Sequence, residues 1–250
     1  YSELIMAKLY TFGCSFTSYL WPTWADILLT EFDGENWALP GGGNKFIFES
    51  LTECLVTNGI TKDDTVIIMW SSWAREDRYF DTGWNLFGNV YNNHFYDEKF
   101  LKKYWNDAGA ILDNFNWICA AHALLENIGC KYIMTSAFPF FQVKEWTEIC
   151  NVQDLIDVDR FDKYFKFLER HKDKTVTNNL YQTKYNSDYL YNKVSWKNTP
   201  DRDNHPLPLQ HYQWLEDNIL NKLNLNGQQL NHIKLKATEM HNNCIKEIDA

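Results

Sequence analysis

A serine, an aspartate and a histidine stand in this sequence at places where they can perform nucleophilic chemistry together. Ser15 follows the short apolar run 8–12 and a turn at Gly13. Asp203 and His205 lie near the other end of the chain, in a proline-rich loop. An imidazole that a carboxylate orients can take the proton of a serine hydroxyl. We therefore predict that Ser15 is a nucleophile, His205 its base and Asp203 the orienting carboxylate.

Each of these assignments has an alternative in the sequence. The turn that holds Ser15 can simply be a tight exit from a strand. His211 is a second candidate base, but its place at the start of a following helix favours a structural role. Asp201 is a second candidate for the orienting carboxylate, and we prefer Asp203 because it is closer to His205.

A mostly parallel sheet is the element that must position these side chains. Apolar runs predict strands at residues 8–12, 37–40, 65–70 and 130–138. Helical spacing predicts helices at residues 22–32, 46–55, 108–127, 143–174 and 212–223. This alternation predicts one α/β domain over residues 1–250. Ligands of open α/β sheets bind at the carboxyl ends of the strands, and we expect Ser15 at that edge.

Some stretches do not fit the alternation. Residues 79–104 are rich in aromatic side chains and asparagine and predict an irregular insertion, either a lid or a wall of the substrate site. Residues 76–78 predict a solvated loop with local ion pairs, whereas Trp73 and Arg75 are our candidates for contacts with substrate. Residues 224–250 are polar and predict a peripheral helix or a mobile tail.

Composition excludes several classes of partner. The chain has 250 residues and a formal net charge of -9 with both signs interspersed, which disfavours nucleic acid and anionic membranes. It has neither a secretory leader nor an apolar run of the roughly 18 residues that cross a bilayer, so we expect a cytoplasmic protein. The six cysteines form no Cys-x-x-Cys pair and predict buried reduced thiols. We therefore expect neither a metal nor another cofactor.

These motifs resemble those of the SGNH hydrolases, the superfamily that includes GDSL-type esterases, lipases, thioesterases and sugar O-acetylesterases. Residues 13–17, Gly-Cys-Ser-Phe-Thr, resemble its first block, residues 39–44 its second and residues 203–206 its last. The resemblance implies a flavodoxin-like three-layer α/β/α sandwich. It also implies an oxyanion hole built by the backbone N–H groups of Ser15 and Gly41.

The chain departs from the pattern of that family in three places. Cys14 replaces the usual aspartate beside the nucleophile, and one residue instead of two separates Asp203 from His205. After the third strand the family carries an asparagine, where this chain has residues 71–73, Ser-Ser-Trp. The candidates for the missing oxyanion donor are Ser72, Asn44 and a backbone N–H group.

The function that the resemblance implies is a serine esterase acting on a small-molecule or glycan ester, with a carbohydrate O-acetyl group as one candidate. A non-catalytic module that binds a glycan or a protein through the aromatic insertion is an alternative from another class. Transfer of the acyl group to an acceptor other than water is a third possibility. The sequence does not indicate an oligomeric state.

Overall fold

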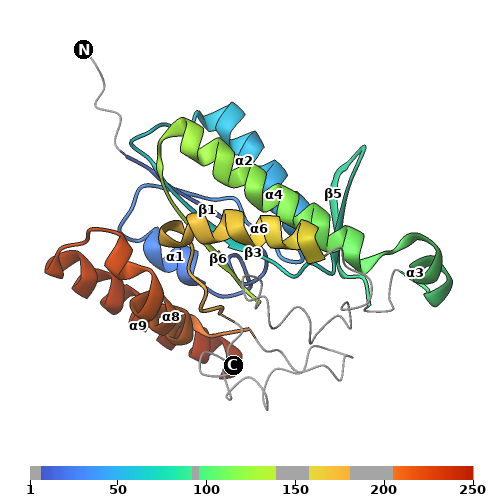
Figure 1. Cartoon of the computed structure of the whole chain (residues 1–250). Helices are drawn as coiled ribbons and strands as arrows, with labels where there is room; N and C mark the ends of the chain where they lie inside the picture. The colour runs from blue at the N-terminus through green and yellow to red at the C-terminus, as the bar shows by residue number, and fades with distance from the viewer. Residues whose placement is uncertain (1–6, 92–95, 139–157, 181–204, 250) are drawn as a thin grey trace.

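A four-stranded parallel sheet lies at the centre of the computed structural model, which describes residues 7–91, 96–138, 158–180 and 205–249 (Figure 1). The strands are β1 (Leu9–Phe12), β2 (Gly34–Asn36), β3 (Thr65–Trp70) and β6 (Lys131–Ser136), in the order β2-β1-β3-β6. Three of the four predicted strands are confirmed at nearly the predicted bounds. Their apolar runs are continuous because helices cover both faces of the sheet.

The second strand lies earlier than predicted. Residues 37–40 form the connection after β2, while the polar residues of β2 pair with Leu9, Tyr10 and Thr11 of β1. The prediction was wrong because β2 is an edge strand, and an edge strand can hold its place through backbone hydrogen bonds without an apolar pattern.

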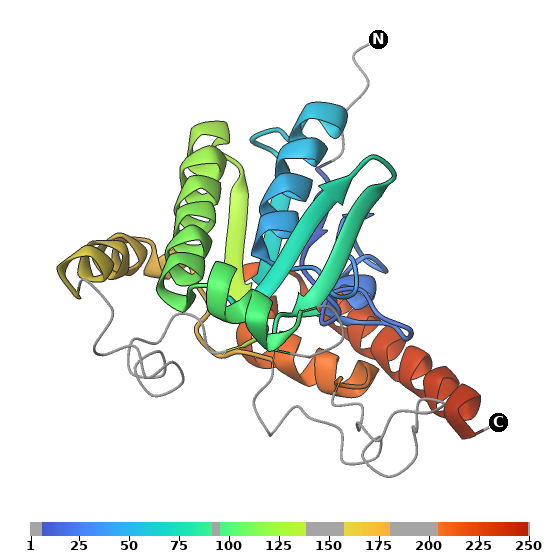
Figure 2. The same cartoon turned by 90° about the vertical axis from the view of Figure 1, so that its right-hand side faces the viewer.

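Different helices cover the two faces of the sheet. In β3, Val66, Ile68 and Trp70 point to one face, and Ile67 and Met69 to the other. The first face packs against α2 (Asn44–Asn58) and α4 (Asp107–Ile128), and the second against α1 (Trp24–Leu28), α8 (Pro208–Asn218) and α9 (Gly227–Asp249). Figures 1 and 2 show these layers on opposite sides of the strands. The predicted α/β/α sandwich is confirmed.

A further helix, α6 (Val158–Arg170), joins the layer of α2 and α4 and places Leu168 in its core. A short 3-10 turn (Lys172–Lys174) follows it, and Thr175 then bridges to Met134 of β6. The helix predicted at residues 143–174 is thus confirmed in its second half, and residues 143–157 lie outside the described part of the chain.

The predicted irregular insertion contains regular structure. Strands β4 (Arg75–Phe80) and β5 (Gly83–Asn89) form an antiparallel hairpin beside α2, and α3 (Glu98–Tyr104) follows (Figure 2). The hairpin includes residues 76–78, which we predicted as a solvated loop; the predicted ion pair between Glu76 and Arg78 is present, but Asp77 is buried. A bulge near Arg75 shifts the register of the hairpin. It interrupts the alternation of inward and outward side chains by which a strand is recognised in a sequence.

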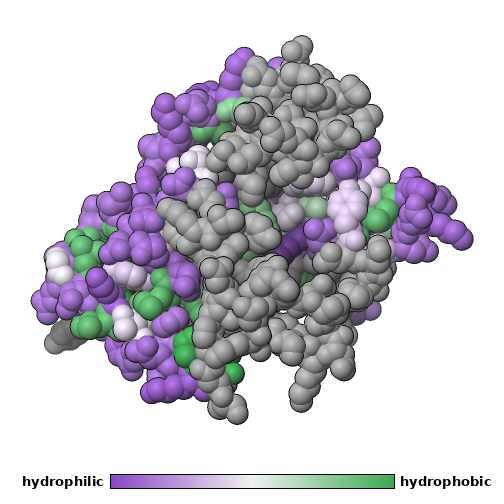
Figure 3. All heavy atoms as spheres, turned by 90° about the horizontal axis from the view of Figure 1, so that it is seen from below, coloured by the Kyte–Doolittle hydropathy of each residue, from purple (hydrophilic) through white to green (hydrophobic). Residues whose placement is uncertain are grey.

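The terminal stretch forms the long helix α9 instead of a tail. Ile233 and Ala237 are buried in the core shared with α1 and α8, and His232 lies 2.7 Å from the carboxylate of Glu31. From below, hydrophobic side chains form small groups mainly towards the side where α8 and α9 lie (Figure 3). Within the described residues, no helix combines the length and apolarity needed to cross a bilayer.

Candidate active site

Ser15 lies in a tight turn directly after β1. The backbone N–H groups of Thr17 and Ser18 both donate to the carbonyl of Cys14, at 2.8 and 3.0 Å, and fold the chain back at the serine. Gly13 is required for this turn because a Cβ there would come within 2.0 Å of the Thr17 hydroxyl oxygen. The serine is therefore presented at the carboxyl edge of the sheet, with 6% of its surface exposed.

His205 meets Ser15 although the two are 190 residues apart: its Nε2 lies 2.8 Å from the serine Oγ. The imidazole stacks on the ring of Tyr19, with centroids 3.8 Å apart and planes 14° apart, and its centroid lies 4.8 Å from that of Phe16. Trp21 Nε1 donates to the carbonyl of Pro206 at 2.8 Å and fixes the loop that carries the histidine. Aromatic contacts and one buried hydrogen bond thus hold the ring at the serine.

The candidate orienting carboxylates and the alternative base His211 lie near His205 in the sequence. Asp203 and Asp201 lie outside the described residues, so the orienting carboxylate stays a prediction. His211 is buried inside α8, as the structural alternative predicts, and burial, with a further contribution from His205, lowers its pKa to about 3. His205, not His211, therefore occupies the position of a base beside Ser15.

Gly41 lies in the connection between β2 and α2, and β2 is the neighbour of β1, the strand that Ser15 follows. Its φ of +84° is in the region that favours glycine, and a Cβ there would lie 3.3 Å from the carbonyl oxygen of Leu86 in β5. The hairpin thus packs closely over this loop. The donation of the Gly41 N–H to an oxyanion stays a prediction.

Asn44 joins the glycine loop to the end of β3. Its Oδ1 accepts from the Ser71 N–H at 2.6 Å, and its Nδ2 donates to the Ser71 carbonyl at 3.1 Å and to Asn114 Oδ1. Both amide hydrogens are used inside the protein, which corrects our suggestion that Asn44 supplies an oxyanion donor. Ser72 is half-buried, and its Oγ accepts from the Ala74 N–H at 3.3 Å, so its hydroxyl hydrogen keeps the capacity to donate.

Asp77 and Arg75 of β4 hold the same loop from its other side. The two carboxylate oxygens of Asp77 accept from the N–H groups of Gly43 and Phe46 at 2.8 and 2.9 Å, and Arg75 Nη1 donates to the Gly42 carbonyl at 2.9 Å. Burial raises the pKa of Asp77, and the two backbone hydrogen bonds oppose this effect. The N-cap of α2 is Gly43, which has no side chain to satisfy these N–H groups.

Sequence reasoning missed Asp77. The missing side-chain cap at the start of α2 was the available signal, because a buried helix terminus needs an acceptor from elsewhere in the chain.

Arg75 and Trp73, our candidates for substrate contacts, line one cavity of about 550 Å³. The Arg75 guanidinium lies 5.9 Å from the ring centroid of Phe138, which lies 5.5 Å from that of Phe16 beside His205. The described lining residues of this cavity do not include Ser15. Ring contacts through Phe138 and Phe16 thus connect Arg75, in the lining of this cavity, with His205.

Four buried or partly buried cysteines of the described residues are poor candidates for a second nucleophile. Burial raises the pKa of Cys54 to about 12 and the pKa values of Cys119, Cys130 and Cys244 to about 11, so these thiols stay protonated near neutral pH. Cys150 lies outside the described residues. Over the described ranges, no group of three or more His, Cys, Asp or Glu side chains is placed to bind a metal ion.

Comparison with known proteins gives few matches. No family model and no curated protein sequence matches the chain. Among solved structures, the chain is similar to a GDSL-like lipase from Bacteroides thetaiotaomicron, with a TM-score of 0.45 and 15% identity, covering 87% of this chain and 88% of that lipase. At this level of similarity, the chemistry of the chain must be argued from its own site.

Proposed function

We propose that this chain is a serine hydrolase that cleaves a carboxylic ester through an acyl-enzyme. The observation that carries the proposal is the 2.8 Å separation between His205 Nε2 and Ser15 Oγ. A serine hydroxyl that donates to a neutral imidazole can lose its proton as its oxygen attacks a carbonyl carbon. The stacked contact with Tyr19 supports the proposal, because it keeps the imidazole plane in one orientation.

The reaction follows the usual sequence of acyl transfer. Ser15 Oγ bonds to the carbonyl carbon, its proton passes to His205, and the imidazolium returns that proton to the departing alkoxide. Water then gives a proton to His205 and attacks the acyl carbon. The bond from that carbon to Ser15 Oγ breaks, the carboxylic acid is released, and His205 returns the proton to Ser15 Oγ. Asp203 is our proposed orienting carboxylate for the imidazole.

The oxyanion of the tetrahedral intermediate needs hydrogen-bond donors. We assign this role to the backbone N–H groups of Ser15 and Gly41, with the Ser72 hydroxyl as a further candidate. The contacts of Asn44, Arg75 and Asp77 support the assignment of Gly41, because they fix the loop that carries it.

A fluorophosphonate probe and a short p-nitrophenyl ester together test the proposal. We expect the probe to label Ser15 and the ester to be hydrolysed, and we expect Ser15→Ala to abolish both. Ser50→Ala is the matched control, because Ser50 is also buried but lies in α2. Absence of labelling and hydrolysis in folded protein would contradict the proposal and favour the binding module.

The proposal also specifies which acyl group is cleaved and which molecule accepts it. We propose a carbohydrate O-acetyl group as the substrate and water as the acceptor. Product analysis in the presence of added alcohols separates hydrolysis from transfer: free acid as the main product supports the hydrolase, and a predominant new ester indicates an O-acyltransferase.

A further inference from the structure

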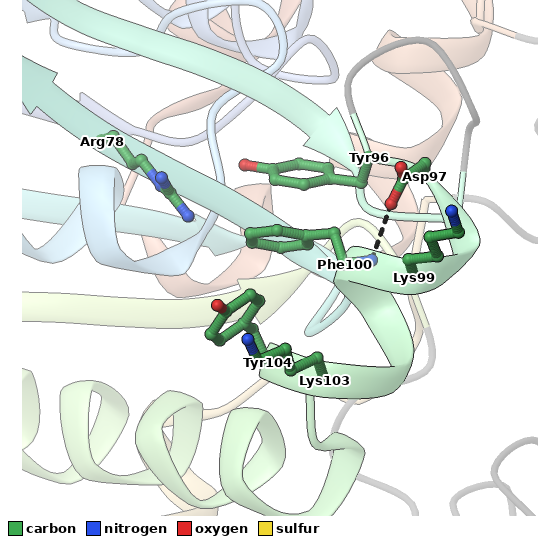
Figure 4. A pocket seen from close by; sticks show the side chains of 7 residues that line it. All are labelled: Arg78, Tyr96, Asp97, Lys99, Phe100, Lys103 and Tyr104. Carbon is green, nitrogen blue, oxygen red and sulfur yellow. Dashed lines mark hydrogen bonds between the residues drawn. The ribbon is translucent and has the colours of Figure 1, made fainter.

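A second cavity, of about 620 Å³, lies between the hairpin and α3. Three aromatic rings line it, those of Tyr96, Phe100 and Tyr104, with successive centroids 4.7 and 5.2 Å apart. Figure 4 shows the rings following one another along the cavity, with Arg78 opposite them. The cavity is within the size range of small-molecule sites. Tyr96 is buried and Phe100 packs between its two neighbours, so the exposed ring of Tyr104 offers the main aromatic surface to a ligand.

The charge of this cavity is opposite to that of the whole chain. Arg78, Lys99 and Lys103 contribute to its lining, in a protein of net charge -9. Asp97 is the single carboxylate among the described lining residues, and it already accepts from the Phe100 N–H at 2.7 Å. Arg78 is paired with Glu76, which leaves the two lysines as the main source of positive charge.

The two cavities adjoin each other, because Arg78, Phe100 and Tyr104 line both. Trp73 and Arg75 line the inner one, and the rings of Phe138 and Phe16 lie in sequence between Arg75 and His205. We call the two cavities together the aromatic cleft. Its inner cavity is also lined by the carboxylates of Glu76, Asp77 and Asp113, so the excess of positive charge belongs to the outer cavity. The aromatic cleft extends from Trp73 and Arg75 to the exposed end of α3, and the ring contacts through Phe138 and Phe16 connect its Arg75 end with His205.

We infer that the aromatic cleft binds an anionic carbohydrate, whose ester group Ser15 attacks. A sugar ring has apolar C–H faces that fit an aromatic surface and a rim of hydroxyl groups that fits polar side chains. A carboxylate or sulfate on the sugar pairs with Lys99 and Lys103. The cleavage of the ester by Ser15 rests on the proposed function, whereas the binding of the carbohydrate does not.

Binding is measured in the Ser15→Ala background by affinity gel electrophoresis, so that catalysis does not contribute. The probes are polygalacturonate as the anionic polysaccharide, dextran as a neutral one, and polyglutamate and a single-stranded oligonucleotide as anions without the same sugar rings. We expect polygalacturonate alone to retard the protein strongly, and less so at about 0.5 M salt because screening weakens ion pairs.

Two pairs of variants locate the site. Tyr104→Ala is compared with Tyr79→Ala, since both tyrosines are 65% exposed but Tyr79 does not line the cleft. Lys103→Ala is compared with Lys102→Ala on the same helix. We expect Tyr104→Ala to weaken binding about fivefold and Lys103→Ala about twofold to fivefold, with both controls unchanged.

Equal losses in the control variants would overturn the location of the site. Equal retardation by dextran would overturn the anionic preference, and stronger retardation by polyglutamate or the oligonucleotide would overturn the carbohydrate. Failure of the proposed function is distinguishable: the Ser15→Ala protein still binds polygalacturonate, but the unmodified protein hydrolyses no ester.

Discussion

At the scale of single residues, the pairing of Ser15 with His205 was predictable because each residue stands in a short motif that can be recognised locally. A turn glycine marks the serine, and prolines with an aspartate mark the histidine loop. The aromatic contacts that hold the imidazole were not predictable. Tyr19 and Phe16 follow Ser15 closely in sequence, but no periodicity indicates that their rings face His205.

Replacing His205 should remove the base. We expect His205→Ala to lower kcat for a p-nitrophenyl ester by about 10²–10⁴, because general base catalysis contributes a factor of that size. His232→Ala is the control, since His232 lies on α9 and contacts Glu31 instead of the serine. Equal rates for the His205→Ala and unmodified proteins would remove His205 from the mechanism.

Tyr19 should act as a positioning residue for the imidazole. We expect Tyr19→Leu to lower kcat about twofold to tenfold with little change in KM, since an aromatic contact contributes roughly 0.5–1.5 kcal/mol. Tyr19→Phe keeps the stacked ring and should restore kcat. If Tyr19→Phe is as slow as Tyr19→Leu, the hydroxyl matters and the stacking explanation fails.

At the scale of elements, prediction succeeded where burial determines the sequence. The central strands β1, β3 and β6 are covered on both faces, and their apolar runs were sufficient to locate them. β2 and the β4–β5 hairpin were not located, because an edge strand and a two-stranded ribbon are held by backbone pairing and a few contacts on one side. Such elements leave a weaker apolar pattern in the sequence.

The cap that β4 provides for α2 can be tested at Asp77. We expect Asp77→Ala to destabilise the protein by about 1–3 kcal/mol, because it leaves the buried N–H groups of Gly43 and Phe46 without their acceptor. Urea unfolding measures this change. Asp81→Ala, at an exposed position of the hairpin, should change stability by less than about 0.5 kcal/mol.

The loop that Asp77 holds also contains Gly41, so a loss of kcat should accompany the loss of stability. In the Asp77→Ala protein, measured well below its melting temperature, we expect a lower kcat for the p-nitrophenyl ester than in the Asp81→Ala protein. Equal kcat values would show that the cap serves stability alone.

The packing of α4 against β6 should make stability dependent on pH. His122 is fully buried, with Nδ1 3.1 Å from the Tyr132 hydroxyl oxygen, which in turn donates to Glu126. Burial, followed by the nearby His171, lowers the pKa of His122 to about 4. The unfolded histidine has a pKa of about 6.5, so the unfolded chain takes up the proton first as the pH falls.

Stability from His122 is therefore present above about pH 6.5 and is lost as the pH falls towards 4, by about 2 kcal/mol at pH 5. Buried His211 acts in the same direction. Urea unfolding at about pH 7.5 and about pH 5 measures the effect. In His122→Gln the difference between the two conditions should shrink, and an unchanged difference would exclude this histidine as its source.

At the scale of the whole molecule, α9 should be part of the same cooperative unit as the sheet. We expect Ile233→Ala to cost about 2–5 kcal/mol, since Ile233 is 0% exposed in the core shared with α1 and α8. Leu235→Ala on the same helix should have little effect, because Leu235 is 60% exposed. If unfolding of α9 precedes the main transition, the helix is peripheral after all.

The three-layer architecture followed from the alternation of strands and helices, whereas the contacts between distant parts of the chain did not. The meeting of Trp21 with Pro206, and of Asp77 with Gly43, depends on how loops pack after the layers have formed. One sequence contains no direct signal for such pairs. The aromatic cleft is a further example, because its lining comes from β4, α3 and α4 together.

The separation of Ser15 and His205 along the chain sets the earliest point at which the proposed activity could arise. Ser15 is synthesised 190 residues before His205 and before the helices α8 and α9 that follow it. A growing chain, or a fragment cut before residue 205, would carry a serine without its base. Under the proposed function, Ser15 therefore becomes reactive only after His205 has been synthesised and its loop has folded against the serine, and probe labelling of Ser15 would report both events in one signal.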